Sequence, residues 1–365
     1  MVVFPEEQLD SPVGYFAGRL GMTLQDGKWR IIRKLGWGPR SSTWLVTDTA
    51  DSTIVRAIKI FTTQESQGSV AAKEVEVLKE LRATSPLHIS WLHDHFHERS
   101  AKGDHLCLVF HPYGKTIESL CQTNTEGHYL MLHIAKQVAG EALAALAELH
   151  ENSVIHGSIT GHHFLLGMLD AEDVRAAGVY TTSAEAKELT GNDGVRYAVI
   201  LSQPLEPAGW DSKWNQTAVE FAERYIYLIS LGHARREDRD TVAGAIQDTN
   251  APIPPEALTG GEVSFSSDIW QFGCLAFRLI TGTPFLDETY FMAPIEFLTR
   301  NLSEMEARLS STGALAEADI PVTASFLRAC LALDPAQRPN SEEVFDHDWI
   351  IGGDVCSCGW CAEKD

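Results

Sequence analysis

The sequence predicts an α+β fold with two lobes, a small β-rich N-terminal lobe followed by a larger, mainly helical lobe. At 365 residues the chain is long enough to form two hydrophobic cores. Short apolar, strand-like runs are concentrated between residues 29 and 110, whereas longer helical patterns follow residue 129. The expected parts are an N-terminal arm (1–27), the first lobe (28–114), the second lobe (115–350, with an insertion at about 168–220) and a Cys-containing tail (351–365).

The composition is that of an ordinary globular protein with a strong acidic excess. Hydrophobic residues make up 44% and charged residues 22% of the chain. The formal net charge of −21 argues against direct DNA binding and general nucleic-acid binding, because both require a basic surface. The acidic excess favours either a basic protein partner or simply high solubility.

The cysteines do not show the pattern of a disulfide framework. Four of the seven lie scattered in apolar surroundings and are expected to be buried thiols: Cys107, Cys121, Cys274 and Cys330. The sequence also shows neither a secretory leader pattern nor an apolar run of about 18 residues, so no membrane association is expected. Together these features predict a reducing, intracellular location, either cytoplasmic or nuclear.

The first lobe begins with a strand-like pattern over Trp29–Leu35 that leads into two glycines, Gly36 and Gly38. Glycines at such a position permit a tight turn in which backbone N–H groups can face a phosphate. Two glycines in a hairpin are equally compatible with an ordinary turn. The phosphate interpretation therefore depends on residues further along the chain.

A lysine and a glutamate supply this support. The apolar strand Val55–Phe61 contains Lys59, and a helical pattern over Ala71–Leu81 contains Glu74. A strand Lys paired with a Glu on a following helix is an arrangement that positions nucleotide phosphates. The alternative is a strand Lys and a surface Glu that do not meet.

Two more strands, around Trp91–Phe96 and His105–Phe110, complete the first lobe before a linker at Pro112–Gly114. Three alternating histidines on the earlier strand would share one face of the sheet: His93, His95 and His97. No acidic or Cys partner with metal-ligand spacing accompanies them, so a metal site is not expected there.

The second lobe is organised around a small polar loop between two apolar runs, Val154–Ile155 and Phe164–Leu166. A long helical pattern over Tyr129–His150 precedes the loop. The two runs are expected to be short buried strands that hold the loop in a tight hairpin. The insertion that follows is expected to contain a short helix near Ala184–Leu189 and a strand near Tyr197–Leu201.

Two further elements complete the second lobe. An apolar strand over Ile226–Ile229 leads into the triplet Ser230–Gly232. A helix over Ser267–Gly282 is apolar on nearly every face, which places it at the centre of the lobe. Ser267 or Asp268 is expected to cap the start of this helix, and Gly282 to end it.

In this order the motifs resemble the eukaryotic protein kinase family over about residues 28–350, and in particular the SR-protein kinases and their fungal relatives. The segments that carry the closer resemblance are Arg33–Gly38, Ser42–Leu45, His105–Phe110, Ile200–Leu205 and Ser230–Ala234. The resemblance implies a bilobal protein-kinase-like fold with an ATP pocket. The residues that it assigns to this pocket are Gly36, Gly38, Ala57, Lys59, Glu74, Phe110 and Tyr113.

The resemblance also assigns structural roles in the second lobe. Residues 235–255 correspond to the activation segment of the family. Glu256 and Arg338 match a buried ion pair that joins this segment to the helical lobe. Asp268 matches the central-helix Asp that steadies the catalytic loop.

The departures from the kinase pattern fall on the residues that carry the chemistry. Ser158 stands where the resemblance implies the catalytic Asp, and Thr160 where it implies a phosphate-neutralising Lys. His163 and Ser230 replace the two Mg²⁺ ligands. A positioned general base is typically worth about 10²–10⁴-fold in rate, and metal stabilisation of the phosphoryl group adds to it. A neutral hydroxyl supplies neither effect, so ordinary kinase activity is expected to be lost or very weak.

Three functions are compatible with this pattern. The first is a pseudokinase that acts as a scaffold or allosteric regulator, with residual ATP binding that is weak and independent of Mg²⁺. The second is a kinase-fold enzyme with another transfer reaction, such as acyl or aminoacyl transfer in a fungal pathway, with His156, His162 or His163 as base. The third is a weakly active serine/threonine protein kinase. The acidic charge favours a basic or Arg-rich protein partner in each case.

The tail contains three closely spaced cysteines, Cys356, Cys358 and Cys361. A two-residue gap such as that between the last two is common in zinc sites, and His347 lies near enough in sequence to be a fourth ligand. The tail is therefore a candidate zinc site or redox clasp. The alternative is an exposed, mobile tail without a metal.

Overall fold

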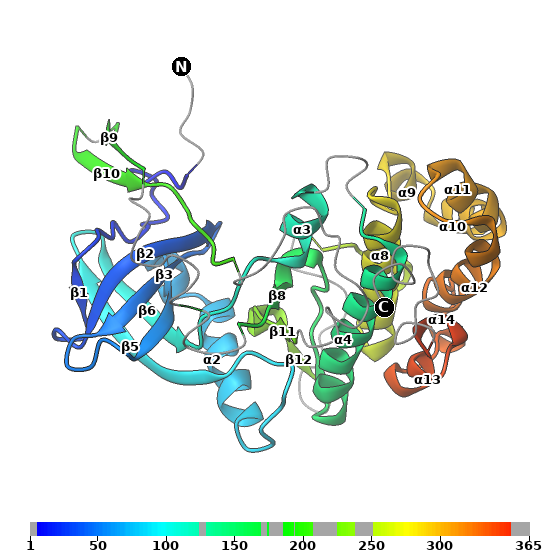
Figure 1. Cartoon of the computed structure of the whole chain (residues 1–365), viewed down its shortest axis with the longest axis horizontal. Helices are drawn as coiled ribbons and strands as arrows, with labels where there is room; N and C mark the ends of the chain where they lie inside the picture. The colour runs from blue at the N-terminus through cyan, green and yellow to red at the C-terminus, as the bar shows by residue number, and fades with distance from the viewer. Residues whose placement is uncertain are drawn as a thin grey trace, which may run out of the picture. The chain divides into compact units, whose positions relative to one another are not determined.

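The computed structural model of the chain divides into two compact units (Figure 1). It describes residues 6–123, 129–168, 174, 185–192, 194–206, 225–237 and 251–351. The first unit comprises Met1–Ser85, Ser90–Lys115 and Gly167–Gly209, and the second comprises Pro86–Ile89, Thr116–Leu166 and Trp210–Asp365. The described residues between Gly167 and Gly209 thus join the N-terminal unit, whereas the sequence places them in the second lobe as an insertion.

The first unit is built on a six-stranded antiparallel sheet with strand order β1-β2-β3-β4-β6-β5. Its strands are β1 (Thr23–Leu24), β2 (Trp29–Gly38), β3 (Ser41–Asp48), β4 (Val55–Phe61), β5 (Leu92–Ser100) and β6 (Gly103–Phe110). Two helices follow β4, namely α1 (Thr63–Ser66) and α2 (Ser69–Leu81). The strands and the helix that the sequence predicts for the first lobe are confirmed, with small differences at their ends.

The pleat of this sheet separates two apolar clusters. Ile31, Val46 and Ile58 pack on one face. Leu45 and Val55 belong to a second cluster. Because successive side chains of a strand point to opposite faces, Leu45 and its neighbour Val46 lie on opposite sides. Each face of the sheet is therefore covered by apolar side chains.

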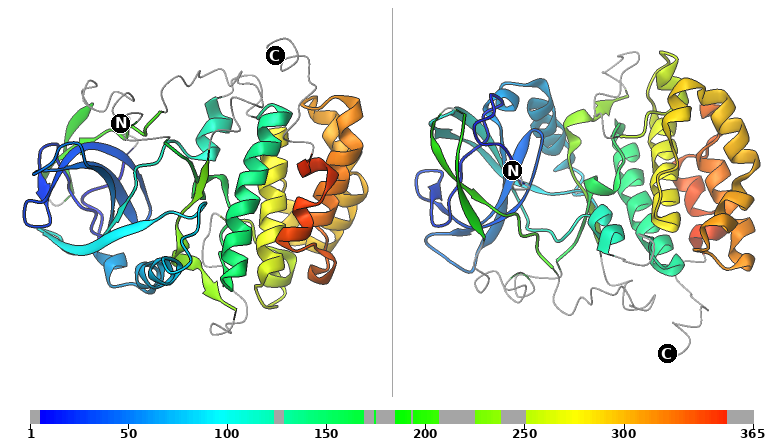
Figure 2. Two further views of the ribbon diagram at one scale, coloured as in Figure 1. Left: turned by 60° about the horizontal axis from the view of Figure 1, so that its bottom comes forward. Right: turned by 90° about the horizontal axis from the view of Figure 1, so that it is seen from above.

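Two segments outside the sheet pack with each other in the first unit. The described residues before β1 are mostly irregular, and Leu9 and Tyr15 among them are buried. Tyr197 and Val199 pack with these two side chains in one cluster. They belong to an antiparallel hairpin formed by β9 (Ala186–Thr190) and β10 (Arg196–Ile200). Figure 2 shows this hairpin in green near the blue N-terminal strands.

The first strand of the hairpin corrects the sequence-based expectation. A short helix is predicted near Ala184–Leu189, but Ala186–Thr190 is a strand that pairs along its whole length with β10. All of its side chains are exposed, so no apolar face selects one conformation over the other. Helix propensity is a weak preference, and long-range pairing overrides it here. The strand predicted near Tyr197–Leu201 is confirmed as β10.

The second unit is mainly helical and contains the two long helices predicted for it, α4 (Leu132–Glu151) and α8 (Phe265–Thr281). Nearly every side chain of α8 is buried, as its apolar sequence predicts. Within the described residues, the other α-helices of this unit are α3 (Ile117–Thr123), α7 (Pro255–Leu258), α9 (Glu288–Met292), α10 (Pro294–Ser303), α11 (Met305–Thr312), α12 (Ile320–Cys330), α13 (Ser341–Phe345) and α14 (Asp348–Ile351). Among the described residues, no helix is long and apolar enough to cross a membrane.

The polar loop of the second unit is held by two separate strand pairs. β7 (Val154–Ile155) pairs with β12 (Arg235–Arg236), and β8 (Phe164–Leu166) pairs with β11 (Ile226–Leu228). The predicted hairpin between β7 and β8 is therefore wrong. The segment between them contains a 3₁₀ turn, η1 (Gly161–His163), and each short strand pairs with residues flanking the Ser230–Gly232 triplet instead. This pairing joins the loop to the segments on both sides of the triplet.

The ends of α8 differ from the prediction in one respect. Ser264 is the N-cap rather than Ser267 or Asp268, and it forms a reciprocal capping box with Ser267. Asp268 is fully buried in the first turn of the helix. Gly282 ends the helix with φ 75°, as the sequence predicts, because glycine adopts this left-handed conformation without strain.

Candidate functional site

Lys59 and Glu74 form the ion pair that the sequence predicts in the first unit. The Lys59 Nζ donates to both carboxylate oxygens of Glu74, at 2.8 and 2.7 Å. Glu74 lies on the buried side of α2, with a side chain only 3% exposed, whereas Lys59 on β4 is 17% exposed. Partial burial makes this pair stronger than a surface pair, because solvent screens it less. The alternative in which the two side chains do not meet is excluded.

The register of the sheet gathers most of the other proposed nucleotide-binding positions on one face. Ala57 pairs with Leu45 on β3 and with Phe110 on β6. Directly opposed residues share a face of a sheet, and Lys59 lies two residues beyond Ala57 on the same side. Ala57 and Phe110 are only 5% and 8% exposed. Tyr113 is also buried, and its hydroxyl accepts a hydrogen bond from the Trp91 N–H at 3.3 Å.

The two glycines of the first unit lie at the end of the β2–β3 hairpin. Neither Gly36 nor Gly38 has positive φ, and a Cβ added at either would meet no atom within 4 Å. Their backbone is therefore approachable rather than crowded. The hydroxyl of Tyr15 donates to the carbonyl of Gly38 at 3.0 Å, and its ring meets Trp37 edge-on. The sequence does not predict this restraint, because Tyr15 lies in the N-terminal arm.

The side chain of Asp268 binds the backbone of the polar loop of the second unit. Its two carboxylate oxygens accept hydrogen bonds from the N–H groups of His156 at 2.7 Å and Gly157 at 2.8 Å. The Nε2 of His150 lies 3.1 Å from the same carboxylate. The amide oxygen of Gln271, one turn further along α8, accepts from the Ile159 N–H at 2.9 Å. The role that the resemblance gives Asp268 is confirmed, and Gln271 is a second anchor that sequence reasoning missed.

His156 is locked into the core of the loop. Its side chain is fully buried, and its Nδ1 accepts the Ser158 N–H at 3.1 Å. The proton of the neutral ring is therefore on Nε2, which donates to the carbonyl of Ile229 at 3.1 Å. Burial lowers the pKa of His156 to about 4, and the neighbouring His163 ring adds to this shift. With both nitrogens engaged, His156 is poorly placed to accept a proton from a substrate.

Ser158 and His163 lie side by side in the same loop. The Nδ1 of His163 donates to the Ser158 carbonyl at 2.7 Å, and the Ser158 hydroxyl is 3.3 Å from the same nitrogen. A protonated Nδ1 cannot deprotonate that hydroxyl. His163 is half-buried at the end of η1, and its neighbour His162 is exposed. Of the three histidines considered as bases, His162 and His163 thus remain the accessible ones.

Thr160 and Ser230 complete the set of positions that depart from the kinase pattern. Thr160 is half-buried and precedes η1 in extended conformation. Ser230 adopts a left-handed conformation with φ 68°, which is uncommon for a residue other than glycine. The N–H of the preceding Ile229 donates to the His163 carbonyl at 2.9 Å, which links the triplet to the loop. The segments 154–166 and 226–236 contain no Asp or Glu.

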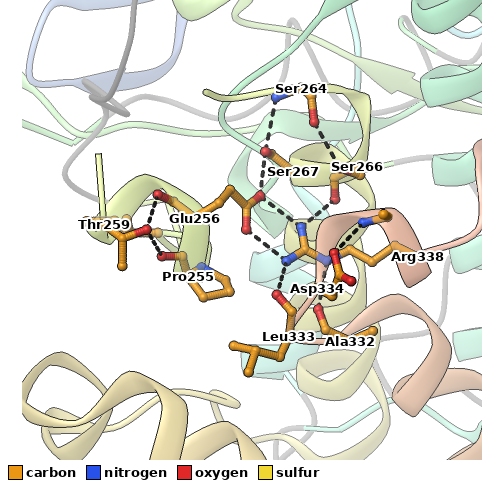
Figure 3. A network of polar contacts seen from close by, with 12 residues as sticks. Pro255, Glu256, Thr259, Ser264, Ser266, Ser267, Ala332, Leu333, Asp334 and Arg338 are labelled. Carbon is orange, nitrogen blue, oxygen red and sulfur yellow. Dashed lines mark hydrogen bonds and ion pairs between the residues drawn. The ribbon is translucent and has the colours of Figure 1, made fainter. Parts of the chain in front are cut away.

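Arg338 and Glu256 form the ion pair that the resemblance implies (Figure 3). Two nitrogens of the guanidinium donate to the two carboxylate oxygens, both at 2.8 Å. The Ser267 hydroxyl donates to the same carboxylate at 2.7 Å. Burial alone would raise the pKa of Glu256, but the hydrogen bonds and charge of Arg338 outweigh it and lower the pKa. The carboxylate therefore stays ionised inside the second unit.

A buried ion cluster in the first unit was missed by sequence reasoning. Lys34 is 1% exposed, and its Nζ contacts the carboxylates of Glu6, at 2.5 Å, and Glu7. The same nitrogen donates to the carbonyl of Ile200 at 3.1 Å. The Ser202 N–H and hydroxyl donate to Glu6 at 2.6 and 2.9 Å. No local pattern predicts this cluster, because it joins β2 to the arm and to the end of the β9–β10 hairpin.

Of the four candidate zinc ligands, His347 lies within the described residues and the three cysteines do not. No group of three His, Cys, Asp or Glu side chains within the described ranges is arranged to hold a metal ion. His347 contacts the Ser325 hydroxyl at 3.3 Å, and burial lowers its pKa. Cys356, Cys358 and Cys361 lie outside the described residues. The zinc hypothesis for the tail therefore stays a prediction.

Comparison with known proteins identifies the fold. A family model described as "Protein kinase domain" matches residues 218–350. A crystal structure of the PF14_0431 kinase domain superposes with a TM-score of 0.63 and covers 93% of this chain and all of the other, at 20% sequence identity. The chain has a protein kinase fold. The identity to that structure is too low to transfer more than the fold.

The curated proteins that this chain resembles include two yeast protein kinases. Protein kinase dsk1 of Schizosaccharomyces pombe is 24% identical over 353 residues, which cover 75% of this chain and 64% of that protein. Serine/threonine-protein kinase SKY1 of Saccharomyces cerevisiae is 25% identical over 263 residues, 66% of this chain and 34% of that protein. The chain is distantly related to these two proteins and spans less than two thirds of the length of either.

Proposed function

We propose that this kinase domain is a pseudokinase that acts as a scaffold or allosteric regulator. The observation that carries the proposal is that the backbone of the loop is held by hydrogen bonds, while the loop itself contains no carboxylate. Asp268 and Gln271 hold the backbone of the loop, while Ser158 stands where a kinase has its general base. These hydrogen bonds are evidence that the loop is folded. The side chains at the substituted positions are the reason to expect the loss of ordinary phosphotransfer.

The magnitude of the expected loss follows from the chemistry. A general base contributes about 10²–10⁴-fold to rate. Electrostatic stabilisation of the transferring phosphoryl group usually contributes as much or more, and here both protein ligands for Mg²⁺ are replaced, by His163 and Ser230. Losses of this size would reduce a kinase turnover of about 1–100 s⁻¹ to a rate that is hard to detect.

Adenine-nucleotide binding that is weak and independent of Mg²⁺ belongs to the same proposal. The paired Lys59 and Glu74 support it, since this pair positions nucleotide phosphates in kinases. The open backbone at Gly36 and Gly38 is compatible with a phosphate at the hairpin. Because His163 and Ser230 stand at the positions of the Mg²⁺ ligands, we expect that Mg²⁺ does not raise the affinity for nucleotide.

A basic or Arg-rich protein is the proposed partner. The relation to SR-protein kinases supports this choice, as does the net charge of −21. An Arg-Ser repeat peptide should bind with an affinity that falls as salt rises, and a matched peptide with Glu in place of Arg should not bind. Equal binding of the two peptides would remove the electrostatic basis for this partner.

A phosphotransfer assay with a restored variant tests the pseudokinase proposal. The wild-type chain and the triple variant Ser158→Asp, His163→Asn and Ser230→Asp are each incubated with Mg²⁺, ATP and the Arg-Ser peptide. We expect no turnover by the wild type and detectable turnover by the variant, after melting curves have shown that both are folded. Turnover of about 1 s⁻¹ by the wild type would refute the proposal and identify an active serine/threonine protein kinase.

A second candidate function is a transfer reaction other than phosphotransfer to protein, such as acyl or aminoacyl transfer. The observation that favours it is that His162 is exposed and His163 only half-buried in the loop, so these two rings are the accessible candidate bases. Such an enzyme would add a group of characteristic mass to itself or to a partner. Intact-mass spectrometry after incubation with ATP and acyl or aminoacyl donors detects the adduct, and loss of the adduct in His163→Ala but not His156→Ala would support this function.

A further inference from the structure

Four basic side chains lie close together in the first unit, outside the site described above. We call Arg56, Arg82, His93 and His111 the basic cluster. They come from β4, from the residue after α2, from β5 and from the residue after β6. All four belong to the same compact unit. The grouping runs against the charge of the chain as a whole, which is −21.

The register of the sheet places Arg56 beside His111. The end of β6 pairs with Ala57 on β4 and with Leu92 on β5. One position further, Arg56 and Trp91 lie on either side of His111, and opposed residues share a face of a sheet. Because Ala57 faces the proposed nucleotide-binding side, Arg56 next to it points to the opposite side. The charge of Arg56 also lowers the pKa of His111, after the larger effect of burial, which agrees with their closeness.

Arg82 and His93 complete the basic cluster. The guanidinium carbon of Arg82 lies 5.4 Å from the centre of the Trp91 ring, a cation–π contact that orients this side chain. His93 is the extra residue of a β-bulge in β5. Burial, and after it the positive charges of Arg56, His111 and Arg82, lower the pKa of His93 to about 4. The four groups are therefore near enough to act on one another electrostatically.

No carboxylate compensates the basic cluster within the described part of the chain. Arg56 donates one hydrogen bond, to a backbone carbonyl at 2.8 Å, and burial lowers its pKa with no acidic group opposing the shift. Asp94 follows His93 in the sequence but is engaged elsewhere. It accepts a hydrogen bond from the Gln25 amide at 3.2 Å and lies 4.0 Å from the ammonium of Lys28. The cluster therefore has an excess of positive charge and several N–H donors left for a ligand.

We propose that the basic cluster is a binding site for a phosphate group, on the side of the sheet away from the nucleotide-binding residues. Two guanidinium groups carry two positive charges at neutral pH, which match the charge of about −1.5 to −2 on a phosphate monoester. The planar guanidinium fork also fits two phosphate oxygens at once. His93 and His111 add imidazole donors beside them. Free phosphate and a phosphorylated side chain share this chemistry, and the proposal does not depend on nucleotide binding.

The test compares Arg56→Gln and Arg82→Gln with the matched control Arg99→Gln. Arg99 lies on β5 in the same unit, is 85% exposed and is ion-paired with Asp104. Affinities for inorganic phosphate and for a blocked phosphoserine tripeptide are measured by calorimetry, after melting curves have confirmed folding. We expect about tenfold weaker binding by each cluster variant and no change for the control. Arg82 is exposed, so its substitution should leave the fold intact.

The titration of His93, followed by NMR, locates the bound phosphate. A negative charge nearby favours the protonated imidazole, so phosphate should raise the pKa of His93 above its value of about 4. No rise in this pKa, or equal affinities of the wild type, Arg56→Gln and Arg82→Gln, would overturn the proposal. Equal binding of the unphosphorylated tripeptide would overturn it as well. Tighter binding of the phosphoserine tripeptide than of inorganic phosphate would identify a phosphorylated side chain as the ligand, whereas equal binding would show that the phosphate group alone suffices.

Discussion

Replacing Arg338 with Met removes a guanidinium from the interior of the second unit and keeps an apolar stem of similar length. The Arg338 side chain is fully buried, and its partner Glu256 is only 11% exposed. Removing one partner of a buried pair typically costs about 3–5 kcal/mol, because the other charge is left without compensation. For a domain of this size 1 kcal/mol corresponds to roughly 2–4 °C in melting temperature. We expect Arg338→Met to melt about 6–20 °C below the wild type.

Differential scanning calorimetry or circular dichroism measures this shift. Arg300→Met on α10 is the matched control, because Arg300 is exposed and should change the melting temperature little. The double variant Arg338→Met with Glu256→Gln should recover part of the loss, since no charge is then left unpaired. A melting temperature within about 2 °C of the wild type for Arg338→Met would refute the argument that the pair stabilises this unit.

Three further predictions concern nucleotide, pH and metal. Calorimetric titration of ATP should give similar affinities in EDTA and in Mg²⁺ and much weaker binding for Lys59→Ala, so a strong gain with Mg²⁺ would contradict the proposal. Burial holds the pKa of His156 in the folded protein near 4, below its usual 6.5. The stability that depends on the neutral ring is therefore present above pH 6.5 and is lost as pH falls towards 4, by about 3 kcal/mol in all. Denaturant unfolding at a series of pH values should show this loss, and the free energy of unfolding of His156→Gln should depend less on pH. Elemental analysis of protein purified without chelator tests the hypothesis that the tail binds zinc. Less than about a tenth of an equivalent of zinc, with Cys358 and Cys361 reacting freely with a thiol reagent, would favour a tail without metal.

Periodicity and spacing predict the parts of this fold that are encoded locally. The sheet strands of the first unit and helices α4 and α8 follow from apolar patterns within each segment. Lys59 and Glu74 could be paired in advance because a strand and the following helix are adjacent in the chain. The roles of Asp268 and of Glu256 with Arg338 came from the family resemblance rather than from spacing, and the structure confirms these contacts.

The features that escaped prediction depend on contacts between distant parts of the chain. β9 is a strand only because it pairs with β10, and its own sequence favours a helix. β7 and β8 pair with the segments around Ser230 rather than with each other. Lys34 lies in a strand whose pattern gives no reason to expect a buried charge. Its partners are two arm residues and a carbonyl far along the chain. Strand pairing and ion pairing between residues this far apart in the chain leave no pattern in the sequence around either residue.

The hydrogen bonds from the loop to Asp268 and Gln271 do not depend on the side chains that would carry out a reaction. The groups that they bind are main-chain N–H groups, which every residue except proline possesses. Ser158 contributes its own N–H to His156 in the same manner, whatever its side chain. If the proposed loss of a carboxylate at position 158 is right, it removes a general base without costing the loop one of these bonds. Selection for a stable fold cannot detect such a loss, so a lineage can keep the shape of a kinase long after its reaction has disappeared.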